Sequence, residues 1–232
     1  FVPESYFKTL GHFSKSDNSI FTAKYSKNIQ KDEKFSEFLD GFINAKFIVD
    51  NVQKKPISRK PSAPFTTSTL QQESSRKLGF NVSRTMQAAQ KLYEAGHITY
   101  MRTDSNNLSD FATKLISEVI SVNYGKEYSK SRIYSTKSKN AQQAHEAVRP
   151  TNFSKKVLNL DADQSNLYDL IWKRTVASQM SDAILDKTIV KINSNNHDGI
   201  FQSEGEVIKF DGFLKLYQET KDNVVLDESK NN

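Results

Sequence analysis

The sequence predicts an α+β fold in which an all-helical domain is inserted into a β-rich one. Up to about residue 59 the apolar residues form short extended runs, whereas over residues 60–186 they recur at helical spacing behind capping signals. From residue 187 the apolar period changes to two. The chain has 232 residues, enough for two domains with cores of their own. We therefore expect a β-rich domain of residues 1–59 and 187–232 and a helical domain of residues 60–186.

The first zone combines strands with one short helix. Apolar residues at positions 7–13 and 20–25 predict two strands joined by a polar turn at Ser16, Asp17 and Asn18. An apolar stripe at helical spacing then predicts a helix, which Gly41 weakens: Phe35, Phe38, Leu39 and Phe42. An extended run begins again at Phe47.

The helical zone is divided by capping residues and by glycines that end helices. The expected N-caps are Ser68, Ser83, Ser109 and Asp161, and the first and last of these have a glutamine three residues on. Gly79, Gly96 and Gly125 follow the first three helices. In the second helix we expect the core-facing residues to include Met86, Ala89 and Tyr93. The run Ala183, Ile184 and Leu185 is expected to close this zone.

The last zone alternates apolar and polar residues. Thr188, Val190 and Ile192 predict a strand, and the segment 193–196 predicts a turn. Two further strands are expected at residues 200–202 and 207–210, followed by an Asp-Gly turn and the apolar segment 213–217.

Positive charge is concentrated in two segments. Residues 54–105 contain nine basic and three acidic side chains, and residues 125–156 contain eight and two, so each segment carries +6. The whole chain also carries +6, so the remaining residues sum to about −6. Such segments favour a polyanionic partner, although a solvated basic face is an alternative interpretation.

The composition excludes several classes of protein. There is no cysteine, so disulfides, thiolate metal sites and cysteine nucleophiles are excluded. No apolar run approaches the length of a membrane span, and no signal peptide is visible. The chain begins with Phe1 rather than methionine, as expected of a piece of a longer protein. We expect a cytoplasmic location and no membrane partner.

Tyr100 is the candidate nucleophile. It lies four residues after Gly96, on a short connector, and an extended connector would place Arg102 on the same side. A phenol with a pKa near 10 needs a cation or a base to react at neutral pH, and a guanidinium can pair with a phosphate. The pattern is therefore compatible with attack on a phosphodiester. On the residues alone, an ordinary core or interface aromatic remains the alternative.

Five segments, in this order, resemble the central part of bacterial type IA DNA topoisomerases: Pro61–Gly79, Leu92–Ser105, Ala141–Thr151, Leu167–Met180 and Phe210–Phe213. The run Tyr-Met-Arg-Thr-Asp-Ser that begins at Tyr100 is the most specific of these matches. Met101, and the pairing of Glu146 with Arg149, resemble the topoisomerase I branch. The topoisomerase III branch usually has proline after the tyrosine.

This resemblance implies a mechanism and its residues. Tyr100 would cleave one DNA strand and keep its 5′ phosphate as a phosphotyrosine. Strand passage and religation would then relax negative supercoils without ATP. Arg102 would contact the region of the scissile phosphate, and His145 would act in DNA binding and catalysis. The β-rich domain would correspond to the second domain of the family, an arch, and the helical domain to the third.

Further residues are DNA-contact candidates. Gln90 and Glu94 share a helix face, although a surface carboxylate is an equal alternative for Glu94. Thr103 and Asp104 follow the tyrosine directly, and Arg149 follows His145 by four residues. A lone histidine in such a run is usually a surface residue, so the role of His145 depends on the resemblance.

The resemblance also implies what this sequence lacks. In the family, Mg²⁺ is bound by an acidic Toprim domain that has no counterpart in these residues, and no metal site is expected in this chain. The expected partners are a single-stranded segment of negatively supercoiled DNA in the bacterial nucleoid and the remaining domains of the same enzyme. We expect the isolated chain not to relax DNA.

Two alternatives to this assignment differ in function. One is a non-catalytic arch module that binds DNA or a protein. The other is a tyrosine recombinase or type IB enzyme, which forms a 3′ link. That class needs several arginines and histidines near a C-terminal tyrosine, and this mid-chain tyrosine does not fit it.

Overall fold

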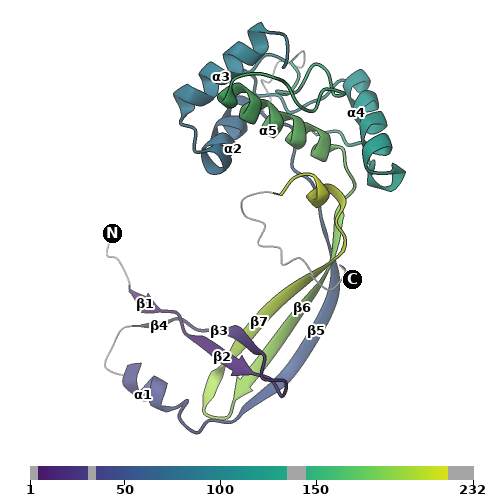
Figure 1. The fold of residues 1–232 in the computed structure, drawn as a ribbon. Coiled ribbons are helices and arrows are strands. Elements are labelled where there is room, and N and C mark those ends of the chain that lie inside the picture. Colours follow the sequence, from purple (N-terminus) through teal and green to yellow (C-terminus); the bar gives the residue numbers. More distant parts are fainter. Residues whose placement is uncertain (1–4, 31–34, 135–144, 219–232) are drawn as a thin grey trace. The chain divides into compact units, whose positions relative to one another are not determined.

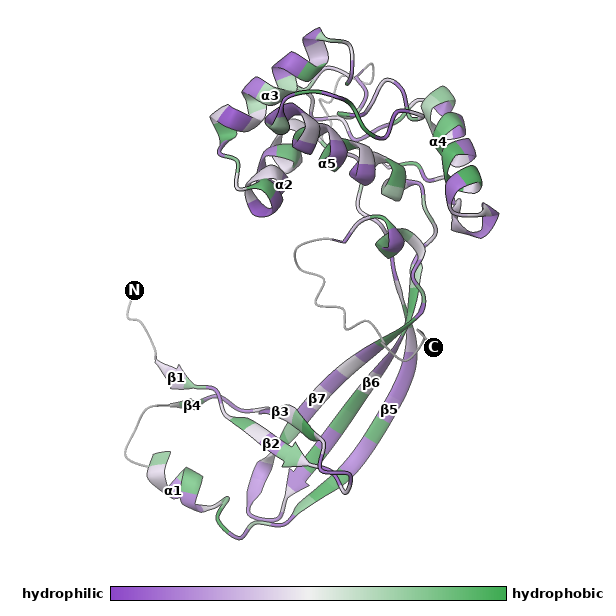
Figure 2. Cartoon of the chain, viewed as in Figure 1, coloured by the Kyte–Doolittle hydropathy of each residue, from purple (hydrophilic) through white to green (hydrophobic). Residues whose placement is uncertain are grey.

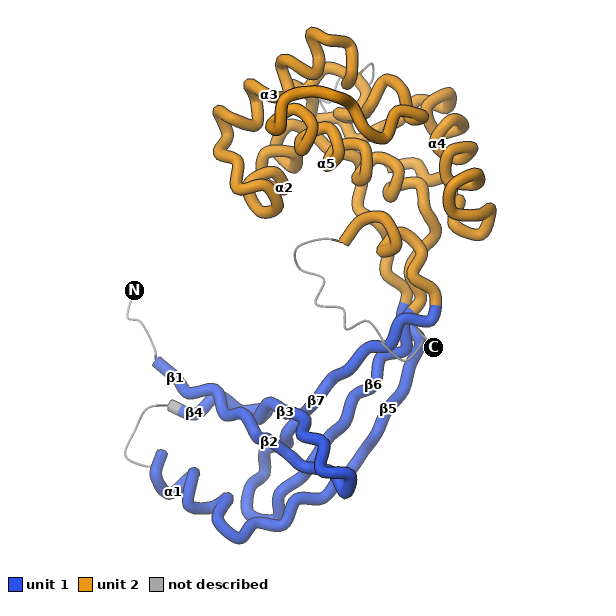
Figure 3. The backbone as a smooth tube through the Cα atoms, in the orientation of Figure 1, with its two compact units in different colours: residues 1–57, 185–209, 224–232 blue, residues 58–184, 210–223 orange. Residues whose placement is uncertain are grey.

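The computed structural model describes residues 5–30, 35–134 and 145–218. The described chain divides into two compact units (Figure 3). Residues 5–57 and 185–209 form what we call the sheet unit, and residues 58–184 and 210–218 form the helical unit. The predicted α+β fold class is confirmed. Residues 210–218 belong to the helical unit. The boundaries predicted from the sequence assign these residues to the β-rich domain.

The sheet unit contains one five-stranded and one two-stranded antiparallel sheet (Figure 1). The strand order in the larger sheet is β2-β3-β7-β6-β5, with His12 opposite Thr22 and Tyr25 opposite Phe201. The elements are β1 (Tyr6–Phe7), β2 (Leu10–Ser14), β3 (Ile20–Tyr25), β4 (Ile29–Gln30), α1 (Phe35–Asp40), β5 (Phe47–Arg59), β6 (Ala183–Ser194) and β7 (His197–Phe210).

Aromatic side chains form the core of the sheet unit. Tyr25 and Phe201 are buried with their ring centroids 5.1 Å apart, and Phe42 packs against both. Apolar and polar bands follow one another along β5, β6 and β7 in Figure 2, but β5 is exposed over most of its length. A strand turns successive side chains to opposite faces, so Val190 and Ile192 of β6 lie on one face and pack into the aromatic core.

The helical unit contains four α-helices and two 3₁₀ turns within the described ranges: α2 (Thr67–Leu78), α3 (Val82–Glu94), α4 (Asp110–Asn123), η1 (Lys126–Tyr128), α5 (Ala162–Ser178) and η2 (Gly212–Lys215). Its core contains aliphatic residues, among them Leu70, Leu92, Ile116 and Ile171, which are inaccessible to solvent, together with buried aromatic residues such as Phe65. None of the helices in the described part of the chain is long and apolar enough to cross a membrane.

Some predicted helix starts are right and others are wrong. Ser109 and Asp161 cap α4 and α5, and Gly79 ends α2 with φ +66°. Helix α2, however, is capped by Thr66, which forms a capping box with Thr69 instead of Ser68 with Gln71. Helix α3 is capped by Asn81 instead of Ser83, because the Asn81 side chain accepts from the Arg84 amide.

The strand boundaries also differ from the prediction. β6 begins at Ala183, so the run that was expected to close the helical zone is extended. β7 is one continuous strand over the two segments predicted separately, because no turn interrupts it at residues 203–206. The apolar segment after Asp211 forms η2, with Gly212 at φ +51°. Phe213, Leu214 and Tyr217 are buried there, so tertiary packing decides its conformation.

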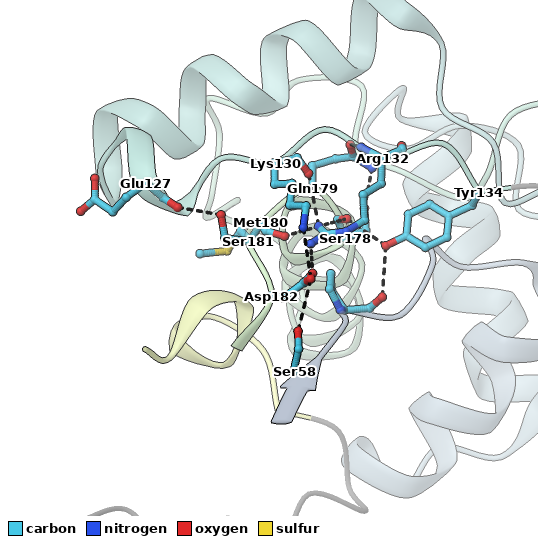
Figure 4. Close-up of polar contacts among 11 residues, drawn as sticks. Ser58, Glu127, Lys130, Arg132, Tyr134, Ser178, Gln179, Met180, Ser181 and Asp182 are labelled. Atoms are coloured by element: carbon cyan, nitrogen blue, oxygen red, sulfur yellow. Dashed lines mark hydrogen bonds and ion pairs between the residues drawn. The ribbon is translucent and has the colours of Figure 1, made fainter. Parts of the chain in front are cut away.

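A polar network joins the segment 130–134 to the end of α5 (Figure 4). The guanidinium of Arg132 donates to the carbonyl oxygens of Ser178 and Met180 and to the carboxylate of Asp182. Lys130 also donates to Asp182, at 3.1 Å. Burial by itself would raise the pKa of Asp182, but these two hydrogen-bonded cations hold it below its ordinary value. The network thereby supplies partners for carbonyls that a helix end leaves open.

Candidate active site

Helix α3 ends in a left-handed turn that leads to Tyr100. Gly96 has φ +73°, its amide donates to the Tyr93 carbonyl at 2.8 Å, and the His97 amide donates to the Leu92 carbonyl at 2.8 Å. This is the hydrogen-bond pattern of a Schellman motif, which reverses the chain direction at a helix end. The chain therefore returns beside the last turn of α3, and Tyr100 lies next to Tyr93.

Burial alternates strictly from Tyr100 to Ser105. Met101, Thr103 and Ser105 are buried, whereas Tyr100, Arg102 and Asp104 are exposed. The Tyr100 side chain is 42% exposed. The expected placement of Tyr100 and Arg102 on one side of the connector therefore agrees with the exposure of these residues. Thr103 lies on the buried side, where its hydroxyl accepts from the Ser105 amide at 3.0 Å.

Hydrogen bonds to two other segments hold the connector on two sides. On one side, the Thr99 amide donates to the Arg149 carbonyl at 2.9 Å, and the Thr99 hydroxyl donates to the Ala147 carbonyl at 2.7 Å. On the other side, the Thr67 hydroxyl donates to the Met101 carbonyl at 2.8 Å and accepts from the Thr103 amide at 2.8 Å. The backbone around Tyr100 is thus fixed by segments far away in the sequence.

The segment 145–151 runs beside the connector and carries two of the candidates. His145 is exposed at its start. The Arg149 guanidinium donates to Glu146 Oε2 at 2.5 Å and to the Pro150 carbonyl at 2.9 Å, so much of its donor capacity is used within the protein. The backbone pairing with Thr99 therefore brings His145 and Tyr100 onto adjoining segments.

Glu146 links this segment to α4. Its Oε1 accepts from the Ser109 amide at 2.8 Å, at the N-cap of that helix. Burial by itself would raise the pKa of Glu146, but hydrogen bonds from Arg149 and Ser109 hold it below its ordinary value.

The last turn of α3 forms a polar border to the site. The Gln90 amide donates to Glu94 Oε1 at 2.6 Å, which agrees with their expected shared helix face. Tyr93 lies between them in the sequence and is 40% exposed, contrary to the prediction that it faces the core. The buried residues of α3 are Thr85, Ala88, Ala89 and Leu92, so the apolar face lies one position away from Tyr93.

Sequence reasoning missed three residues that shape the site. Thr67 and Thr99 act through hydrogen bonds to partners 34 to 50 positions away, which no local pattern reveals. Of these three residues, only Tyr93 could have been recognised from the sequence. It lies seven residues before Tyr100, and Gly96, which ends the helix, lies between them.

The described residues contain no group of three or more histidine, aspartate or glutamate side chains that could hold a metal ion. The chemistry available here is that of an exposed phenol, an exposed guanidinium two residues on, and an exposed imidazole on the adjoining segment. Such a set can attack and bind a phosphodiester.

A family model described as DNA topoisomerase matches residues 1–231. The chain therefore belongs to the type IA DNA topoisomerase family. It is 42% identical to DNA topoisomerase 1 of Rickettsia felis over 99% of its length, and 46% identical to that of Streptomyces coelicolor over 91%. The structure of full-length topoisomerase I from Thermotoga maritima matches 97% of the chain with a TM-score of 0.77 and 31% identity.

The chain is short compared with these relatives. It spans 33% of the Rickettsia protein, 23% of the Streptomyces protein and 38% of the Thermotoga chain. The chain therefore corresponds to a part of these longer proteins.

Proposed function

We propose that Tyr100 is the nucleophile with which this part of a type IA topoisomerase cleaves a single DNA strand. The observation that carries this proposal is the alternation of burial, which exposes Tyr100 and Arg102 together on a connector whose backbone is held on both sides. A rigid backbone with exposed reactive groups is the arrangement that positions a nucleophile for attack.

In the proposed step, the phenolic oxygen of Tyr100 attacks the phosphorus of a phosphodiester. A Tyr–O–P bond forms and the bond from phosphorus to the 3′ oxygen breaks, so the 5′ phosphate remains on the protein. One proton leaves the phenol and one reaches the 3′ oxygen, and attack by the 3′ hydroxyl reverses the step. Passage of a strand between the two reactions would relax negative supercoils without ATP.

The other site residues bind and orient the strand. Arg102 pairs with the phosphate oxygens, where negative charge develops during attack. His145 donates a hydrogen bond to the strand from the adjoining segment. Gln90, Glu94 and Asp104 border the strand. Arg149 contributes mainly by holding Glu146, because its guanidinium is already engaged there.

The type IA family depends on Mg²⁺. The described residues do not fit a Mg²⁺ site, since no cluster of ligands occurs among them. We infer that the ion is bound by a Toprim domain outside these 232 residues, and that DNA and that domain are the partners of the helical unit. The 232-residue polypeptide alone is then expected not to relax supercoiled DNA.

Covalent capture of DNA tests the role of Tyr100. The intact protein that contains this chain would be mixed with a single-stranded oligonucleotide labelled at its 3′ end, because the piece that keeps the 5′ phosphate carries this label. We expect labelled protein after denaturation, and none with Tyr100→Phe, while noncovalent binding is unchanged. Capture by the Tyr100→Phe variant would overturn the proposal, and a protein that binds DNA without any capture would support a non-catalytic module instead.

A further inference from the structure

The aromatic ring of Tyr93 packs against the ring of Tyr100. The ring centroids are 5.2 Å apart and the rings are inclined by 62°, which is an edge-to-face arrangement. Within the described ranges, no hydrogen bond from another residue to the Tyr100 hydroxyl restrains that ring. The contact with Tyr93 is therefore a side-chain interaction that favours one orientation of the phenol ring.

The backbone alone does not determine this orientation. Thr99 and Thr67 fix the main chain on either side of Tyr100, but rotation about the side-chain bonds of a 42% exposed tyrosine remains open to several staggered positions. Packing of a neighbouring ring reduces this freedom. The turn at Gly96 brings that ring within reach by leading the chain back along α3.

Tyr93 contributes little to the core of the helical unit. Its neighbour Leu92 is inaccessible to solvent, whereas Tyr93 is 40% exposed. Gln90 and Glu94, on the same side of α3, hydrogen-bond to one another. Tyr93 is therefore a large aromatic residue that adds little to the core but contacts the proposed nucleophile. This favours a role for Tyr93 at the site.

We propose that Tyr93 is a positioning residue for the nucleophile: its ring holds the Tyr100 phenol with the hydroxyl directed toward the bound strand. This inference rests on the proposed function of Tyr100. Preorganisation of the attacking atom lowers the barrier of the cleavage step, because a productive geometry is reached without a search among side-chain rotamers. Tyr93 acts through Tyr100 and does not itself touch the reacting atoms.

Two substitutions separate the ring from the hydroxyl of Tyr93. In the intact protein, Tyr93→Leu removes the ring and Tyr93→Phe keeps it, while Phe111→Leu removes an exposed ring from α4 as a matched control. We expect Tyr93→Leu to slow single-turnover covalent capture roughly 3- to 10-fold, the range of one aromatic pair. Tyr93→Phe and Phe111→Leu should capture DNA at the parent rate.

DNA affinity distinguishes positioning from a direct contact. Dissociation constants would be measured in a Tyr100→Phe background, which cannot form the ester, and Tyr93→Leu should leave them unchanged. A loss of affinity as large as the loss of capture rate would make Tyr93 a stacking platform for a base and overturn the inference. Capture by Tyr93→Leu at the parent rate would overturn it as well.

A spectroscopic measurement keeps the test independent of turnover. With 3-fluorotyrosine at position 100, the ¹⁹F resonance should narrow and shift in Tyr93→Leu and stay near the parent position in Tyr93→Phe. An unchanged resonance in Tyr93→Leu would contradict the inference. Tyr93→Met, which keeps an apolar chain without a ring, replaces Tyr93→Leu if that variant does not fold. Capture by Tyr100→Phe would instead refute the proposed function itself.

Discussion

At the scale of single residues, Glu146 makes two hydrogen-bonded connections beside the candidate site. One carboxylate oxygen accepts from the N-cap amide of α4, and the other accepts from Arg149. Arg149 lies in the segment that pairs with Thr99, so this carboxylate indirectly supports the backbone beside Tyr100. The same geometry explains why the pKa of Glu146 is lowered even though the group is partly buried.

Glu146→Gln should destabilise the helical unit at neutral pH and not at acid pH. The folded pKa lies below the ordinary value of 4.5, so the carboxylate stabilises the fold above about pH 4.5 and this contribution is lost as the pH falls through the folded pKa. We expect a loss of about 1 kcal/mol at pH 7 in thermal unfolding. Glu118→Gln, at an exposed position of α4, serves as the control. An equal effect of Glu146→Gln at pH 7 and pH 3 would contradict this account.

At the scale of elements, the end of α5 depends on a residue from another segment. Arg132 satisfies carbonyl oxygens at Ser178 and Met180 and pairs with Asp182, where β6 is about to begin (Figure 4). Cations near a helix C-terminus also interact favourably with the helix dipole. The helix end and the start of the next strand are therefore held by one side chain.

Arg132→Ala should destabilise the helical unit by about 2–3 kcal/mol, because it removes several hydrogen bonds and leaves a mostly buried carboxylate with only Lys130 and the Ser58 hydroxyl as partners. Arg132→Lys should recover part of this loss. Chemical unfolding would measure the loss of stability. Lys173→Ala serves as the control, because Lys173 forms an exposed ion pair with Asp169 on α5. That control should cost no more than about 0.5 kcal/mol. A similar loss for Arg132→Ala and Lys173→Ala would show that the network contributes little.

Local signals and long-range packing explain which elements could be predicted from the sequence. The caps Ser109 and Asp161 and the stop at Gly79 are local patterns, and all three are right. The run Ala183, Ile184 and Leu185 has no period that separates helix from strand, and its pairing within the sheet determines that it is a strand.

For the site, spacing was enough to place Tyr100 with Arg102. The partners of Thr67 and Thr99 could not be predicted, because those bonds close only after folding.

At the scale of the whole molecule, charge is the property that would govern the proposed binding of DNA. The polypeptide carries +6, and its basic side chains are concentrated in two segments that include the site. Each phosphate that a basic side chain neutralises releases a counterion, so affinity falls as the salt concentration rises.

We expect the polypeptide to bind single-stranded DNA weakly, with an affinity that decreases steeply between 50 and 200 mM salt, as fluorescence anisotropy would measure. Arg102→Gln should lower the slope of log affinity against log salt by about 0.7, the value of one phosphate contact on a single strand. Tyr100→Phe, which changes no charge, should keep the slope of the parent. An affinity that does not respond to salt would rule out phosphate contacts as the source of binding.

The segment after β7 has a consequence for anyone who wishes to express the helical unit by itself. Tyr217 donates to Glu73 at 3.1 Å, Asp211 accepts from Tyr128 at 2.7 Å, and Phe213 and Leu214 are buried. A gene fragment that encodes only residues 58–184 would look complete, because it contains all the α-helices of that unit within the described chain. Its product would nevertheless expose apolar surface that residues 210–218 normally cover. Joining those residues through a short linker, or supplying them as a synthetic peptide, would restore the missing part of the core.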